Sequence, residues 1–284
     1  MRAKQGRGER MTARVALGQF LVVVACYPWL IDCARADDQP SAQFTLGAKV
    51  WDTQWTSWDT VPSRSVVTNG GPVTVVEPVS TNNHFAVIPQ ASVRYGNFLG
   101  SVSYFANTTY NLTGAVDPES GAPLPVSALR RELDGNFGYY VLPSVAVTVG
   151  YKQIEQTFGP SSTAPQLFNW TGPTIGLSGS APLRAHFGLY GAVGVGFLKL
   201  KVDEQLHDAA GNTSFNALYT LGELGVSYSV PTPTKFSFTV TLGYRAQIVT
   251  TEKYALNNGF SNGYNSVDVH DTTQGPALTF VGRY

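Results

Sequence analysis

The chain has 284 residues, of which 43% are hydrophobic and only 13% charged, and it carries 19 basic and 19 acidic residues. An intrinsically disordered chain is excluded, because disorder needs low hydrophobicity and high charge. The zero net charge argues against a nucleic-acid partner, which selects a basic surface. The 29 glycines and the 12% of aromatic residues favour β-structure over a coiled coil.

The first 36 residues have the layout of a secretory signal peptide. Five basic residues precede an apolar run over 15–30, and Ala34 and Ala36 place small side chains at the two positions that a signal peptidase reads. We therefore expect cleavage after Ala36 and a single domain over 37–284. Two alternatives stay open: a transmembrane anchor, although the run is shorter than the ~20 residues of a span, and a lipoprotein lipidated at Cys26.

Cleavage after Ala36 would remove both cysteines and most of the basic charge of the N-terminal region from the mature chain. Both cysteines, Cys26 and Cys33, lie within it, so the mature chain has no disulfide, zinc–thiolate site or thiol nucleophile. The segment also contains six basic and two acidic residues, which leaves 13 basic against 17 acidic residues and a net charge of −4.

Apolar and polar residues alternate with period two along the mature chain. The clearest example is 235–248, where one face carries only Phe236, Phe238, Val240, Leu242, Tyr244, Ala246 and Ile248. A second is 187–197, and each has about the 9 to 11 residues that a tilted membrane strand needs. Eight further segments follow the pattern: 43–52, 84–95, 97–107, 129–141, 144–155, 168–180, 215–230 and 273–284. The segment 168–180 is the weakest, because it contains Pro173.

Short and long connections alternate strictly between these ten segments. The gaps at Gly96, Leu142–Pro143, Ala181–Pro182 and 231–234 are short, whereas 53–83, 108–128, 156–167, 202–214 and 249–272 are long. This asymmetry is typical of membrane barrels with short periplasmic turns and longer extracellular loops. The sequence therefore predicts an all-β fold, a transmembrane antiparallel up-and-down β-barrel of about ten strands with both termini in the periplasm.

Over nearly all of its mature length the chain resembles the bacterial outer-membrane β-barrel class. Its last strand places Leu278, Phe280 and Tyr284 on one face, which is similar to the terminal signal read by the barrel-assembly machinery, and departs from that signal at Gly282. The resemblance implies an outer-membrane location. It also implies contact with outer-membrane lipid, lipopolysaccharide, periplasmic chaperones and the assembly machinery as partners. A soluble secreted all-β domain, such as a jelly roll, is the alternative.

Most charged side chains of the strands fall on the inward face. The strand phases predict seven basic and three acidic residues in the lumen: Lys49, Arg94, Arg130, Lys152, Lys235, Arg245 and Arg283, with Glu132, Asp134 and Glu223. Trp51, Phe105, Tyr140 and Tyr190 also point inward. A ten-strand barrel is close to the size that side chains fill. We therefore expect a polar plug of paired charges, with a narrow anion-preferring pore as the alternative.

One register follows from the short turn at Leu142–Pro143. Strands 129–141 and 144–155 form a tight hairpin about it, so the residue numbers of facing partners have a nearly constant sum. This places Asp134 opposite Lys152 or one step from it, and both side chains point into the lumen.

Candidate catalytic and metal-binding groups are sparse. The segment Asp268-Val269-His270-Asp271 is similar to the Asp-x-His half of the omptin proteases, which are also ten-stranded, but their Asp-x-Asp half has no counterpart here. His84 and His270 are the candidates for metal ligands. Trp51, Trp55 and Trp58 fit an interfacial girdle or loop packing better than a sugar-binding surface. We expect a non-enzymatic structural or surface-presenting barrel without cofactor or metal; an omptin-like surface hydrolase is a further alternative.

Overall fold

The computed structural model describes residues 42–57, 64–68, 71–75, 79–113, 126–159, 166–204, 207, 210–233, 236–252 and 269–284. The predicted signal peptide over 1–36 and the predicted lumen residue Lys235 lie outside them. The strands are β1 Ala42–Ser57, β2 Arg64–Thr68, β3 Gly71–Val75, β4 Val79–Thr81, β5 His84–Tyr95, β6 Phe98–Thr113, β7 Val126–Leu142, β8 Val145–Gly159, β9 Gln166–Arg184, β10 Phe187–Val202, β11 Ser214–Val230, β12 Ser237–Thr251 and β13 Val269–Arg283. No helix within the described part is long and apolar enough to cross a membrane.

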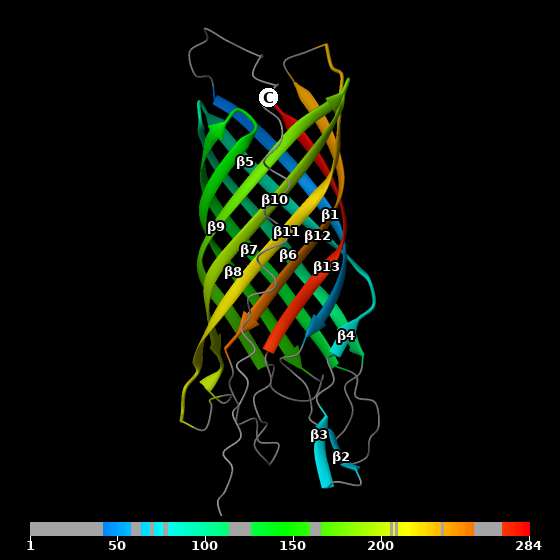
Figure 1. Ribbon diagram of the computed structural model, residues 1–284, viewed down its shortest axis with the longest axis vertical. Coiled ribbons are helices and arrows are strands. Elements are labelled where there is room, and N and C mark those ends of the chain that lie inside the picture. Colours follow the sequence, from blue (N-terminus) through cyan, green and yellow to red (C-terminus); the bar gives the residue numbers. More distant parts are fainter. Residues whose placement is uncertain are drawn as a thin grey trace, which may run out of the picture. The chain divides into compact units, whose positions relative to one another are not determined.

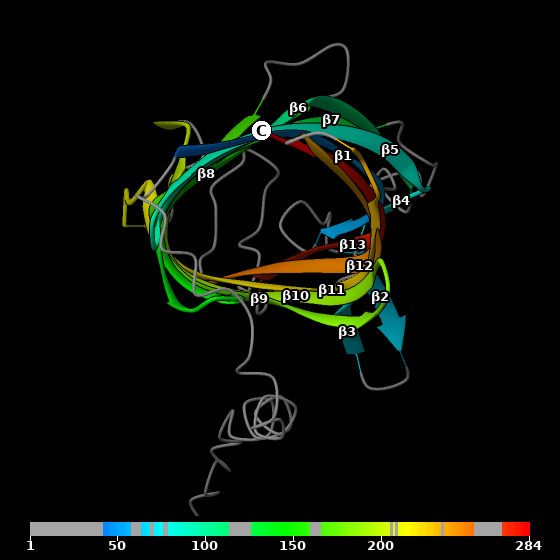
Figure 2. The same ribbon diagram turned by 90° about the horizontal axis from the view of Figure 1, so that it is seen from above.

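Ten of these strands, β1 and β5 to β13, form a closed antiparallel barrel (Figure 1). Each strand pairs with its neighbours along the chain, and β13 returns to pair with β1. Two backbone hydrogen bonds between Phe44 and Tyr284 complete the ring that Figure 2 shows from above. The short β4 pairs with β1 and β6, and β2 and β3 form a separate two-stranded sheet. The predicted fold class and the count of ten barrel strands are confirmed.

The outward face of the barrel changes sharply from apolar to polar along the strands. On β1 the exposed residues Phe44 and Leu46 lie toward the short turns, and beyond Val50 the outward residues are Asp52 and Gln54. The same change occurs at Leu133 to Arg131 on β7, Tyr151 to Gln153 on β8, Phe197 to Lys199 on β10 and Pro276 to Gln274 on β13. An apolar band therefore surrounds the half of the barrel nearest the short turns, and the strands extend beyond it toward the long connections.

One predicted turn is wrong. The sequence placed it at Ala181–Pro182, but β9 continues to Arg184 and the turn lies at Ala185–His186, where Ala185 has a φ of 52°. Pro182 is tolerated in the strand because its pairing with Gly188 lies beside a register shift in the β9–β10 ladder. His186 is therefore a turn residue.

The proline that weakened the prediction of β9 also lies within the strand. Pro173 pairs with Tyr151 of β8, while the ladder with β10 is interrupted between Thr174 and Thr171. Since proline has no N–H to donate, it is accommodated on the side where the ladder has its gap.

The closing contact between β1 and β13 depends on a glycine. Gly275 has a φ of 152°, and a Cβ there would lie 1.8 Å from the carbonyl oxygen of Asp52. We expect Gly275→Ala to lower the free energy of unfolding by about 1 to 3 kcal/mol, because the backbone of alanine is strained in this conformation. Denaturant unfolding in detergent, followed by tryptophan fluorescence, measures the change.

Gly135 supplies the matched control, because a Cβ at that position meets nothing within 4 Å. Gly135→Ala should leave stability within about 0.5 kcal/mol of the wild type. Equal stabilities for the two variants would contradict the close approach of Gly275 to Asp52.

Candidate functional site

The lumen is filled by two sets of side chains on the inward positions of the strands. The charge network consists of Lys49, Arg130, Glu132, Asp134, Lys152, Glu223, Arg245 and Asp271. The aromatic cluster consists of Trp51, Trp55, Phe105, Tyr110, Phe168, Trp170 and Tyr219. Because successive residues of a strand point to opposite faces, each set is built from alternate positions of several strands.

One half of the charge network is centred on Glu223 of β11. Lys49 of β1 donates its Nζ to both carboxylate oxygens at 2.7 and 2.6 Å, and Arg245 of β12 donates at 2.9 Å. The hydroxyl of Tyr190 donates to the same carboxylate at 3.3 Å. The guanidinium of Arg245 also lies 5.2 Å from the ring centroid of Trp51. Glu223 is thereby held by three donors from three strands.

The other half is centred on Glu132 of β7. Its carboxylate accepts from Lys152 at 2.8 Å, from Arg130 at 2.8 Å and from Gln247 at 2.6 Å. Lys152 and Arg130 are 0% and 1% exposed, so their charges depend on these contacts. Asp134 lies directly opposite Lys152 in the β7–β8 ladder and accepts from it at 2.9 Å, which agrees with the register predicted for this hairpin.

Two hydrogen bonds of the network cross the whole lumen. Gln247 of β12 donates to Glu132 of β7, and Gln156 of β8 donates to Asp271 of β13. In the ring of ten strands, the members of each pair are five places apart and so lie on opposite walls. These bonds occupy the cross-section through which a solute would have to pass.

Asp271 is a member of the network that the sequence analysis did not assign to the lumen. It accepts from Trp55 Nε1 at 3.0 Å, and one of its oxygens lies 3.7 Å from Arg130 Nη1. The alternation in β13 could have placed Asp271 in the lumen. Asp271 lies an even number of residues from the inward, buried Thr273 and Ala277, and an odd number from the outward Leu278.

The charges of the network balance. Its four cations are Lys49, Arg130, Lys152 and Arg245, and its four anions are Glu132, Asp134, Glu223 and Asp271. Each cation has a carboxylate partner within 4 Å. The sequence predicted more basic than acidic residues in the lumen, but these eight groups contain equal numbers of both. They therefore give the lumen no net preference for anions.

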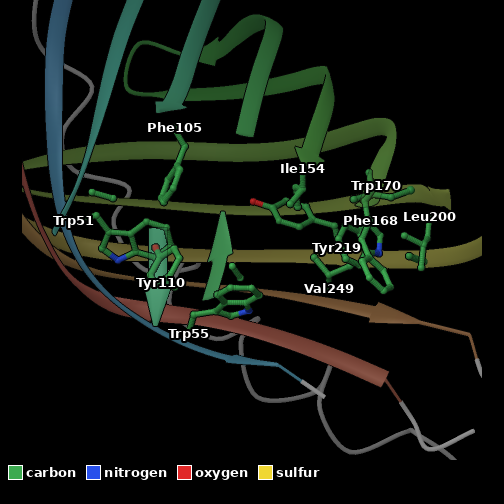
Figure 3. Close-up of a cluster of buried hydrophobic side chains, with 14 of the residues drawn as sticks. Trp51, Trp55, Phe105, Tyr110, Ile154, Phe168, Trp170, Leu200, Tyr219 and Val249 are labelled. Carbon is green, nitrogen blue, oxygen red and sulfur yellow. The ribbon is translucent and has the colours of Figure 1, made fainter. Parts of the chain in front are cut away.

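The aromatic cluster fills the lumen toward the long connections (Figure 3). Trp55 and Tyr110 meet edge to face with 5.3 Å between ring centroids, and Phe168 stacks on Trp170 at 6.0 Å. All four side chains are at most 1% exposed. Trp51 is buried in the lumen, as its strand phase predicts, and Trp55 lies there too, so the expected interfacial girdle is wrong for both. Trp58 lies outside the described residues.

The remaining predicted lumen residues lie near the short-turn rim. Arg94 donates its Nε to the Gly96 carbonyl at 2.9 Å and lies 3.9 Å over the ring of Tyr140. Arg283 is exposed at the last residue of β13.

The residues of the predicted assembly signal lie on the outward face of β13. Phe280 is 38% and Tyr284 75% exposed, and Leu278 shares their phase. Phe280 stacks against Phe238 of the neighbouring strand at 6.4 Å. At Gly282, where the signal departs from its usual form, a Cβ would lie 3.0 Å from the ring of Phe236, which covers this position.

Of the residues considered for hydrolysis, the structure describes His270 and Asp271. His270 and Asp271 are neighbours in β13, so their side chains point to opposite sides, and Asp271 is the inward one. Asp268 lies outside the described residues. His84 contacts Tyr110 with 5.4 Å between ring centroids. No group of three or more metal-ligating side chains occurs within the described ranges.

No protein-family model and no curated protein matches the chain. Among the solved structures to which the chain is similar are three outer-membrane proteins. The outer-membrane protease OmpT of Escherichia coli has 14% identity and a TM-score of 0.48, and the alignment covers 86% of this chain and 96% of that one. A Pseudomonas aeruginosa FadL homologue has 9% identity and a TM-score of 0.34, covering 87% and 90%. The Pseudomonas putida toluene transporter TodX has 8% identity and a TM-score of 0.27, with the same coverage. By its own strand order, closure and apolar outer band, the chain has the architecture of a bacterial outer-membrane β-barrel.

Proposed function

We propose that this chain is an integral outer-membrane protein with a closed lumen, whose barrel holds its long connections at the cell surface without catalysing a reaction. The observation that carries the proposal is the pair of hydrogen bonds, Gln247 to Glu132 and Gln156 to Asp271, that join opposite walls. The buried aromatic cluster packs beside these bonds, with Trp55 donating to Asp271, and fills the lumen toward the long connections. A barrel blocked in this way supports a structural or surface-presenting role better than transport.

The apolar band supports the membrane part of the proposal. Large side chains such as Phe44, Leu46 and Phe137 are 56% to 70% exposed on it, and such a surface is stable only against lipid. With the short turns and both termini in the periplasm, the polar strand ends and the long connections face outward from the cell. Leu278, Phe280 and Tyr284 then present the terminal strand to the assembly machinery, and lipid and lipopolysaccharide surround the band.

Two other functions have less support. An anion-preferring pore needs an open path and an excess of cations, whereas the charge network is balanced and spans the lumen. An omptin-like hydrolase would pair His270 with Asp268, but the chain has no counterpart of the Asp-x-Asp half, and the neighbouring Asp271 points to the opposite face and binds Trp55 and Gln156.

We expect the purified protein to show no steady conductance in a planar lipid bilayer. The variant Gln156→Ser/Gln247→Ser shortens both donors that cross the lumen and should introduce small transient currents. Gln54→Ser/Gln153→Ser is the matched control, because it makes the same chemical change on the outward face and should stay silent. A large ohmic conductance of the wild type would overturn the closed lumen.

A further inference from the structure

The two halves of the lumen are lined by side chains of different size. Between the charge network and the long connections the inward residues are buried, and many of them are large. Between the network and the short turns most inward residues are small and half-buried. Six strands each contribute a hydroxyl there: Ser92, Ser103, Thr148, Ser178, Ser227 and Thr241. Because the same ten strands surround both halves, these small side chains leave the short-turn half unfilled.

Solvent reaches the charge network from the short-turn side. The side chains of Asp134, Arg245 and Lys49, which lie toward that side, are 23%, 13% and 11% exposed. Arg130 and Asp271, which lie farther from the short turns, are each 1% exposed. All five side chains point inward, so the water that contacts the first three lies within the lumen. The network is therefore the floor of the half-filled part.

Tyr190 is a large inward side chain of this half, and it lies along the wall. It faces Gly225 of β11, which in turn faces Gly243 of β12. A Cβ on Gly225 would lie 2.7 Å from Cε1 of Tyr190, and a Cβ on Gly243 would meet its hydroxyl. The ring therefore covers both glycines. Since neither glycine has a side chain, the ring can lie against the strands and leave the middle of the lumen free.

The short turns do not cover the end of this half. Three of them, 96–97, 143–144 and 185–186, have two residues each. A segment of that length is too short to reach across a ring of ten strands. These turns therefore continue the wall and do not cap it.

The charged side chains at this end are basic. Arg94, Arg184 and Arg283 lie beside the short turns, and the described part of the chain has no acidic side chain on the short-turn side of the network. The guanidinium of Arg94 lies 3.9 Å over the ring of Tyr140, and its Nε donates to the Gly96 carbonyl. Within the described residues its terminal nitrogens have no carboxylate partner. Arg94 is therefore held in place with donors to spare.

We propose that the short-turn half of the lumen is a water-filled well that ends at the charge network and takes small anions bearing a carboxylate, sulfonate or phosphate group. This inference rests on the proposed function and deepens it, since in the proposed orientation the well opens to the periplasm. Low-dielectric walls focus the field of the arginines at the mouth and raise the concentration of anions there. The serine and threonine hydroxyls of the wall donate hydrogen bonds to the bound anion.

Cysteine labelling tests whether solutes reach the well. The chain has two cysteines, so with Cys26→Ser and Cys33→Ser an introduced cysteine is the only thiol. Thr241→Cys places that thiol in the well. Thr251→Cys is the matched control, because Thr251 lies on the inward face of the same strand but is 3% exposed beyond the network. In detergent, sulfonatoethyl methanethiosulfonate should modify Thr241→Cys about a hundredfold faster than Thr251→Cys.

Reagents of opposite charge test the preference for anions. The sulfonatoethyl and trimethylammonioethyl reagents are compared on Thr241→Cys, each rate divided by the rate of the same reagent with free cysteine. At low salt we expect a preference of about fivefold for the anionic reagent, which high salt should remove by screening the arginines. Arg94→Gln should lower this preference to about twofold, whereas Arg131→Gln, the same change on the outward face, should leave it unchanged.

The outcomes separate this inference from the proposed function. If Thr241→Cys reacts as slowly as Thr251→Cys, the well does not exist, and the closed barrel stands. Fast labelling at both positions means that the lumen is open throughout, which refutes the closed lumen together with the well. Fast labelling of Thr241→Cys alone, with no preference for the anionic reagent or with a preference that Arg94→Gln does not lower, overturns the anion site.

Discussion

Replacing Glu132 with glutamine should destabilise the barrel by about 3 to 5 kcal/mol, because it removes the central carboxylate of the buried network and leaves four cations with three anions. Lys152 and Arg130 donate to Glu132 at 2.8 Å each and are almost completely buried. Glutamine keeps the volume of the side chain, so the loss reports charge rather than packing. Denaturant unfolding in detergent, and the temperature at which the folded gel band disappears, measure it.

The Arg131–Glu155 pair supplies the control on the outer surface of the same two strands. Its ion pair is 2.7 Å long, but Arg131 is 48% exposed. Glu155→Gln should therefore cost at most about 1 kcal/mol. If Glu132→Gln were no more destabilising than Glu155→Gln, Glu132 would not be the centre of a buried network.

Replacing Trp55 with alanine should also destabilise the protein by about 3 to 5 kcal/mol, since it empties the volume of a fully buried indole. The change removes the edge-to-face contact with Tyr110 and the hydrogen bond to Asp271. The same unfolding measurement applies.

Phe44→Ala is the comparison for Trp55→Ala, because Phe44 is a large side chain of the same strand that is 57% exposed on the apolar band. Lipid or detergent fills the space that Phe44 leaves, so its loss should have a small effect. A Trp55→Ala protein as stable as Phe44→Ala would mean that the lumen beside Trp55 is not close-packed.

Much of the barrel follows from local features of the sequence. Period-two alternation fixes which residues of a strand face inward, and short turns fix the register of adjacent strands, which is why Asp134 was placed opposite Lys152. The two misplaced features, the turn at Ala185–His186 and the continuation of β9 through Pro173, depend on gaps in the ladder with β10. Those gaps involve a second strand, and the pattern of β9 alone does not contain them.

The contacts across the lumen were decided by the tertiary structure. Glu132 and Gln247 are 115 residues apart, as are Gln156 and Asp271. Period-two alternation predicts that a side chain points inward. It does not predict how far along the barrel axis the side chain lies or which side chains it meets across the lumen, because both depend on the tilt and stagger of the strands when the barrel closes. Closure alone therefore determined that four cations in the lumen meet four carboxylates, and that Trp55 lies in the lumen rather than at the membrane surface.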